Sequence, residues 1–140
     1  MKISIVPVNM IDYMFPQCGY HLQRVVDNSH GDLCLEGMKK ELLEGNAGLL
    51  IVTEGDDLIA AMTATVSVMQ TGLRALYLPA IGGDRLDEWM DLMLPMLNEL
   101  AKVYNCTEIR GTGREGWERI LKTRGFKKCH TTFICNIGES

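Results

Sequence analysis

Apolar and polar residues alternate with a period of two in the middle of the chain. In residues 58–69 every second position from Leu58 to Val68 is apolar, which is the spacing of a β-strand. A Gly-Asp turn precedes this segment and a Thr-Gly turn follows it. Together with residues 48–53 and 73–80, the pattern predicts an antiparallel meander of three strands.

Helical spacing appears on both sides of this meander. Residues 84–104 carry apolar residues at alternating intervals of four and three, which predicts the longest helix, with a stripe wide enough to cover a sheet. Residues 11–27 predict a helix broken at Pro16, because proline interrupts helical hydrogen bonding. A turn at residues 28–32 leads into a second helix, so a helical pair precedes the meander.

The two ends of the chain complete the element order. Residues 3–8 predict a first strand, and residues 108–125 predict a short strand, a glycine-rich turn and a helix that stops at Gly125. Residues 126–137 predict a final strand. The expected fold is therefore α/β (α+β), a mixed, mainly antiparallel sheet with the order β-αα-βββ-α-β-α-β.

Composition narrows the class of protein. A chain of 140 residues, 46% hydrophobic, is expected to form one domain, residues 1–140. Its net charge of -4 provides no broad basic surface, so we expect no nucleic-acid partner. Five cysteines without CxxC spacing are typical of reduced thiols in a cytosolic protein. No apolar run has the length of a signal segment or a membrane span, so we expect no membrane partner.

The element order resembles that of the GNAT (acetyltransferase) superfamily over nearly the whole chain. The end of the chain, with the motif I-L-K-T-R-G-F-K-K, is similar to the superfamily's closing helix, Gly-Phe pair and strand. This resemblance implies a GNAT-like fold. It also implies acetyl-CoA as the cofactor if the chain is catalytic.

A narrower resemblance involves residues 81–89 and 113–126. Their motifs, I-G-G-D-R-L-D-E-W and G-R-E-G-W-E-R-I-L-K-T-R-G-F, resemble those of small bacteriophage and prophage acetyltransferase-like proteins of unknown function. A looser resemblance, through L-K-T-x-G, extends to an internal virion protein of short-tailed phages. The resemblance implies a phage-encoded protein in the cytoplasm of a bacterial host or packaged in the virion.

The superfamily's pyrophosphate loop, R/Q-x-x-G-x-G/A, corresponds here to the segment that ends in Ile81, Gly82, Gly83, Asp84 and Arg85. Glycine N-H groups and a helix N-terminus cradle phosphate in such loops. The leading Arg or Gln is absent, however, and the next residues are acidic, which disfavours phosphate. The segment fits Asp84 as a helix N-cap better than a cofactor site, although Arg85 keeps the cofactor interpretation open.

The expected catalytic groups are also missing. Leu121 stands where the superfamily often has an acid tyrosine, five residues before the Phe of Gly-Phe. Tyr77, on a predicted strand, is the remaining catalytic candidate, although a strand tyrosine is more often a core residue.

The glycine-rich turn is the best candidate for a partner or anion site. Arginine forks bind carboxylate or phosphate, and glycines allow close backbone approach; the residues concerned are Arg110, Gly113, Arg114 and Trp117. In the competing interpretation the glycines shape the turn, Trp117 packs the helix on the sheet, and the arginines are solvated.

An alternative metal site would use Cys18, His21, His30 and Cys34. Their i,i+3 and i,i+4 spacings place thiol and imidazole on shared helix faces. The pattern matches no standard zinc finger, and helical cysteines are usually buried apolar residues, so we expect no metal.

Two functions stay open from the sequence. The favoured one is a non-catalytic binding or accessory factor that is virion-associated, acts in assembly or is host-directed, has a degenerate acyl-CoA site and binds a viral or bacterial protein. The alternative is an acetyl-CoA-dependent N-acyltransferase that acts on a small-molecule amine through a divergent pyrophosphate loop.

Overall fold

A five-stranded sheet forms the centre of the molecule. The computed structural model describes residues 1–138, and its strands lie side by side in chain order. β1 to β4 pair antiparallel, whereas β4 and β5 are parallel. The strands are β1 (Lys2–Val6), β2 (Gly48–Glu54), β3 (Asp57–Val68), β4 (Arg74–Gly83) and β5 (Glu108–Gly111). The predicted mixed, mainly antiparallel sheet and its three-strand meander are confirmed.

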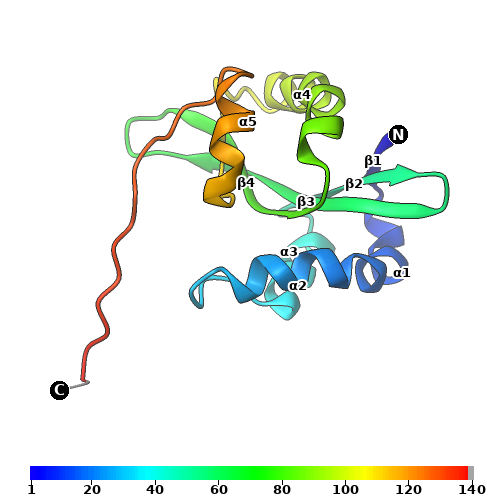
Figure 1. Ribbon diagram of the computed structural model, residues 1–140, viewed down its shortest axis with the longest axis horizontal. Coiled ribbons are helices and arrows are strands. Elements are labelled where there is room, and N and C mark those ends of the chain that lie inside the picture. Colours follow the sequence, from blue (N-terminus) through cyan, green and yellow to red (C-terminus); the bar gives the residue numbers. More distant parts are fainter. Residues whose placement is uncertain (139–140) are drawn as a thin grey trace.

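Helices cover both faces of this sheet (Figure 1). On one face lie α1 (Ile11–Met14), α2 (Gly19–Asp27) and α3 (Leu35–Leu43); on the other lie α4 (Leu86–Val103) and α5 (Glu118–Lys122). Short 3-10 segments are η1 (Val8–Met10), η2 (Phe15–Cys18) and η3 (Glu115–Trp117). Pro16 lies within η2, between α1 and α2, so the predicted helix break occurs there.

Alternating side chains of the strands build one apolar core on each face. In β3, Met62 joins the core under α4, while its neighbour Ala61 joins the core under α1 to α3. The stripe predicted for α4 is buried: Trp89, Met93 and Leu97 are 0% exposed. The apolar face of the strands, which follows a period of two, therefore packs against the apolar stripe of α4, which follows the helical period.

A β-bulge interrupts β4 near its middle. Thr65 pairs with Tyr77 and Thr63 with Ala80, so Leu78 and Pro79 together stand opposite the single residue Ala64. β5 pairs with β4 only as far as Leu78, after which β4 continues to Gly83. The two parallel strands thus share only the first half of β4.

The predicted final strand is wrong. Within residues 1–138 the chain beyond α5 forms no strand, and it extends away from the body of the molecule (Figure 1). The helix α5 ends at Lys122, before the predicted stop at Gly125, and the turn that follows has φ 87° at Gly125 and a hydrogen bond from Phe126 N-H to Leu121 O. The period-two pattern of residues 126–137 reflects β propensity, but a strand also needs a neighbouring strand to pair with, and propensity cannot supply one.

Among the described residues, none of the helices combines the length and the apolar character that a membrane span requires.

Candidate functional site

Both glycines of the loop at the end of β4 lie against the protein's own backbone. A Cβ on Gly82 would lie 2.9 Å from the carbonyl carbon of His21 and 3.0 Å from Val25 Cγ2, both in α2. A Cβ on Gly83 would lie 2.6 Å from Ala60 Cα in β3. Real Cβ atoms need more room than this. The glycines therefore allow close packing of α2 and β3 on β4, and the space that a ligand would need beside them is filled.

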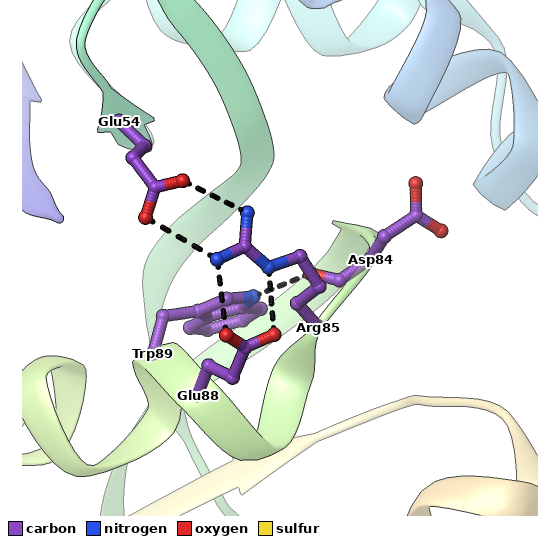
Figure 2. A network of polar contacts seen from close by, with 5 residues as sticks. All are labelled: Glu54, Asp84, Arg85, Glu88 and Trp89. Atoms are coloured by element: carbon purple, nitrogen blue, oxygen red, sulfur yellow. Dashed lines mark hydrogen bonds and ion pairs between the residues drawn. The ribbon is translucent and has the colours of Figure 1, made fainter.

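Arg85 is held by two carboxylates (Figure 2). Its guanidinium donates to Glu88 at 2.6 and 3.0 Å and to both oxygens of Glu54 at 3.2 Å. These hydrogen bonds lower the pKa of Glu54 and of Glu88 and raise the pKa of Arg85. Because two bidentate pairs occupy the fork, Arg85 is not available to a phosphate.

Asp84 is not the N-cap of α4, contrary to the prediction. Arg85, in the left-handed conformation with φ 61°, occupies that position without a capping side chain. The carboxylate of Asp84 instead pairs with Arg24 of α2 at 3.1 Å, and its carbonyl accepts a hydrogen bond from Trp89 Nε1 at 2.8 Å. The fully buried indole fixes the Asp84 backbone, which moves the start of the helix one residue further. Ile81 is half-buried and packs against the core under α4.

The charges at this end of α4 oppose an incoming diphosphate. Asp87 and Glu88 lie in the first turn of the helix, where they already complement its dipole. Arg24 and Arg85 are each paired with a carboxylate, whereas Arg114, the third arginine near the loop, donates to the Gly83 carbonyl. The acidic first turn and the paired Arg24 and Arg85 are therefore a poor match for the pyrophosphate of an acyl-CoA, which is bound by free N-H groups and cations.

The arginine-bearing turn is also engaged with its own chain. Arg114 stacks over the ring of Trp117 at 4.7 Å and donates to Gly83 O at 2.9 Å. A Cβ on Gly113 would lie 2.8 Å from Trp117 Cε3, and Trp117 is buried. Arg110 pairs with Glu108 at 2.8 Å. The structure brings Gly113, Arg114 and Trp117 together as a packing unit and places Arg110 on the neighbouring strand.

The space between β4 and β5 is small and apolar. A cavity of about 40 Å³ lies there, whereas pockets for drug-sized ligands span roughly 300–1,000 Å³. Its walls include Leu78, Ile81, Trp117, Leu121 and Phe126. Leu121 thus contributes an apolar wall at the position where the resemblance implied an acid.

Tyr77 has a local partner. Its hydroxyl lies 2.9 Å from Thr112 Oγ1, just beyond β5. An oxyanion-type contact needs N-H donors, and Pro79 in the bulge beside Tyr77 has none. Among the described residues, the Tyr77 hydroxyl pairs with a hydroxyl and with no carboxylate or imidazole, and Tyr77 stays a candidate.

The four residues of the alternative zinc site lie in separate surroundings. Cys18 is fully buried, and burial raises its pKa to about 11. His21 Nε2 lies 2.9 Å from Leu58 O, and Cys34 Sγ caps α3 by accepting from Gly37 N-H. His30 lies in the α2–α3 turn with φ 56°. Among the described residues no three His, Cys, Asp or Glu side chains gather as a metal site.

The sequence did not indicate the two distant residues, Glu54 and Arg24, that pair with the loop at the end of β4. Glu54 lies 31 positions before Arg85, and Arg24 lies 60 positions before Asp84. Neither pair has a short-range signal in the sequence. The turn signal at residues 54–57 places Glu54 at the end of a hairpin but gives no indication of its contact with Arg85.

Comparison with known proteins connects this architecture to acetyltransferases. No family model and no curated protein matches the sequence. Solved structures match almost end to end, and three of them show the range. A protein described as a probable acetyltransferase has TM-score 0.69 at 15% identity, with 100% of both chains covered. A predicted acetyltransferase with acetyl-CoA from Clostridium acetobutylicum has 0.68 at 16%, covering 97% of this chain and 96% of that one. A ribosomal-protein-alanine N-acetyltransferase from Brucella melitensis has 0.65 at 12%, covering 98% and 100%. The chain therefore has the GNAT fold.

Proposed function

We propose that this protein is a non-catalytic binding factor built on a GNAT fold. One observation carries the proposal: the cavity between β4 and β5 measures about 40 Å³, and apolar side chains and glycine backbone line it. The pantetheine arm of an acyl-CoA needs several times that volume. The engaged Arg85 and the packed glycines beside it support the same conclusion at the pyrophosphate end.

The proposed partner is a protein of the virus or of its bacterial host. Support for this comes from the motifs of residues 81–89 and 113–126, which resemble those of phage and prophage proteins. In this proposal the gene is viral and the product acts as a virion-associated, assembly or host-directed factor, in the host cytoplasm or in the virion. Fold alone does not imply catalysis.

The second candidate is an acetyl-CoA-dependent N-acyltransferase. It is favoured by the similarity in fold to an acetyltransferase whose structure contains acetyl-CoA. In this case α2 and the Arg114 side chain would have to move away from the end of β4 before the cofactor binds. That rearrangement would cost the contacts described above.

A thermal-shift titration with acetyl-CoA and with CoA separates the two. A ligand at a hundred times its dissociation constant stabilises the folded state by about 2.7 kcal/mol. For a chain of this length that is a rise of about 10 °C in the melting temperature. We expect no rise at millimolar ligand, with the Clostridium acetobutylicum protein as the positive control.

A clear rise in the melting temperature would overturn the proposal if Arg85→Glu abolished it while Arg110→Glu left it intact. The second variant is the matched control because Arg110 carries the same charge on β5, away from the end of β4. Release of free CoA thiol from acetyl-CoA in the presence of amines would overturn it as well.

A further inference from the structure

Basic side chains gather at the end of α5. Residues 119–128 contain five lysines and arginines and no acidic residue, although the chain as a whole has a net charge of -4. Four of these basic residues are exposed, and we call them the basic corner: Arg119, Lys122, Lys127 and Lys128. The rest of the chain is therefore strongly acidic, and one small region of the surface carries the opposite sign.

The basic corner has no counter-ions within the fold. In residues 1–138 its four side chains form no ion pair, whereas the cations that do are Arg24, Lys39, Lys40, Arg85, Lys102, Arg110 and Arg124. Every arginine other than Arg119 donates to a carboxylate or to a backbone carbonyl. Because neighbouring like charges repel one another, these four cations are suited to carboxylates supplied from outside.

The helix dipole does not account for this number of cations. A cation in the last turn of a helix complements its dipole, and Arg119 and Lys122 occupy that turn of α5. However, α5 has only five residues, and Arg124 already donates to the Ile120 carbonyl at 2.9 Å. Lys127 and Lys128 lie beyond the helix, so the dipole explains neither of them.

The fifth cation, Arg124, fixes the basic corner on the body of the protein. Its guanidinium donates to the two carboxylate oxygens of Asp91 in α4, at 2.8 and 3.2 Å. Directly before Lys127, the Phe126 N-H donates to Leu121 O and closes the turn that follows α5. A partner would therefore meet cations on an ordered backbone, which lowers the entropy cost of binding.

We propose that the basic corner binds an acidic segment of the partner protein, in which several Asp and Glu side chains meet the four cations together. The inference rests on the proposed function, which takes the partner to be a protein. The corner is open to such a segment because it lies at the end of α5, where the chain leaves the body of the molecule (Figure 1).

The surroundings of the basic corner favour carboxylates over nucleic acid. A nucleic acid is a long polyanion, and it would also face the acidic rest of the chain, whereas a short acidic segment contacts the corner alone. Single strands are held by stacking of bases on exposed aromatic rings. The aromatic residues next to the corner, Trp117 and Phe126, are buried and half-buried.

Fluorescence anisotropy with a labelled oligoglutamate peptide as the probe tests the proposal. We expect the wild type to bind the peptide at low ionic strength and more weakly at about 0.15 M salt, because salt screens exposed charges. The double variant Lys122→Glu/Lys127→Glu reverses two of the four charges, and we expect it to bind about tenfold more weakly. Circular dichroism checks that each variant is folded.

Lys40→Glu/Lys102→Glu is the matched control. It changes the net charge by the same amount, at two exposed lysines whose ion pairs lie within α3 or α4 or at the end of α3. We expect it to bind the peptide as the wild type does. An equal loss of binding in both double variants would overturn the proposal, because the attraction would then depend on net charge and not on the corner.

A wild type that does not bind oligoglutamate would overturn the proposal directly. Tighter binding of a duplex oligonucleotide or of anionic phospholipid vesicles, compared at equal negative charge, would overturn it as well, because the corner would then select phosphate. The acetyl-CoA titration keeps this inference separate from the proposed function. A protein that binds neither oligoglutamate nor acetyl-CoA contradicts the acidic partner alone, whereas one that binds acetyl-CoA contradicts the proposed function.

Discussion

Substitution of Gly82 by alanine tests why glycine stands at the end of β4. The added Cβ would lie 2.9 Å from the His21 carbonyl carbon and 3.0 Å from Val25 Cγ2, so α2 would have to move away. α2 is anchored there, because His21 Nε2 lies 2.9 Å from Leu58 O of β3 and Arg24 pairs with Asp84. Retreat of the helix would strain those contacts as well.

Overpacking of this kind costs about 1–3 kcal/mol, and we expect Gly82→Ala to fall in the upper half of that range. The loss corresponds to a fall of roughly 6–12 °C in the melting temperature of a chain of this length. Urea unfolding followed by circular dichroism measures the free energy of unfolding directly. Neither acetyl-CoA nor any other ligand needs to be present.

Gly19→Ala is the control, because a Cβ on Gly19 meets nothing within 4 Å and φ there is -55°. At the first position of α2 alanine is expected to stabilise by about 0.5–1 kcal/mol. A Gly82→Ala protein as stable as the wild type would refute the reasoning. It would mean that the space beside Gly82 accommodates a Cβ and that packing does not require glycine there.

Three further predictions follow from charge, packing and burial. Hydrogen bonds from Arg85 hold the pKa of Glu54 and of Glu88 below 4.5. The contribution of these two carboxylates to stability is therefore full above that pH and falls as the pH drops through their folded-state pKa values. Free energies of unfolding measured from about pH 6 to pH 3 should decline less steeply in Arg85→Gln than in the wild type. Trp117→Ala removes a buried indole that supports Arg114, and chemical denaturation should show a loss of about 3–5 kcal/mol. The thiol of Cys18, with its pKa raised to about 11, should react with a disulfide reagent only after unfolding, whereas the three exposed thiols react in the native protein.

Most of the fold could be predicted because its signals are local. The period of two over residues 58–69 matches β3, and the alternating intervals of four and three over residues 84–104 match α4. Pro16 and Gly125 mark a helix break and a helix end through the restrictions that each imposes on its own backbone. The order of β2, β3 and β4 also follows, since hairpin turns make consecutive strands neighbours.

The final strand could not be predicted correctly because pairing is a property of two segments. Residues 126–137 have strand propensity, but nothing in their own sequence says whether β5 of the same chain lies within reach. The position of Arg85, rather than Asp84, as the N-cap of α4 was missed for a similar reason. It depends on Trp89 Nε1 reaching back to the Asp84 carbonyl and on Glu54, from a distant hairpin, holding the guanidinium.

The loop at the end of β4 shows why glycine in a sequence is ambiguous between ligand binding and packing. Gly82 and Gly83 stand where a phosphate cradle would need them, and the same absence of a side chain lets α2 and β3 approach β4. The environment of the missing Cβ separates the two roles. On the side of the missing Cβ at Gly82 it is the backbone of His21, which gives way only if α2 moves. A ligand that approached Gly82 from the side of the missing Cβ would therefore have to displace His21 of α2, and with it the contact between His21 Nε2 and Leu58 O.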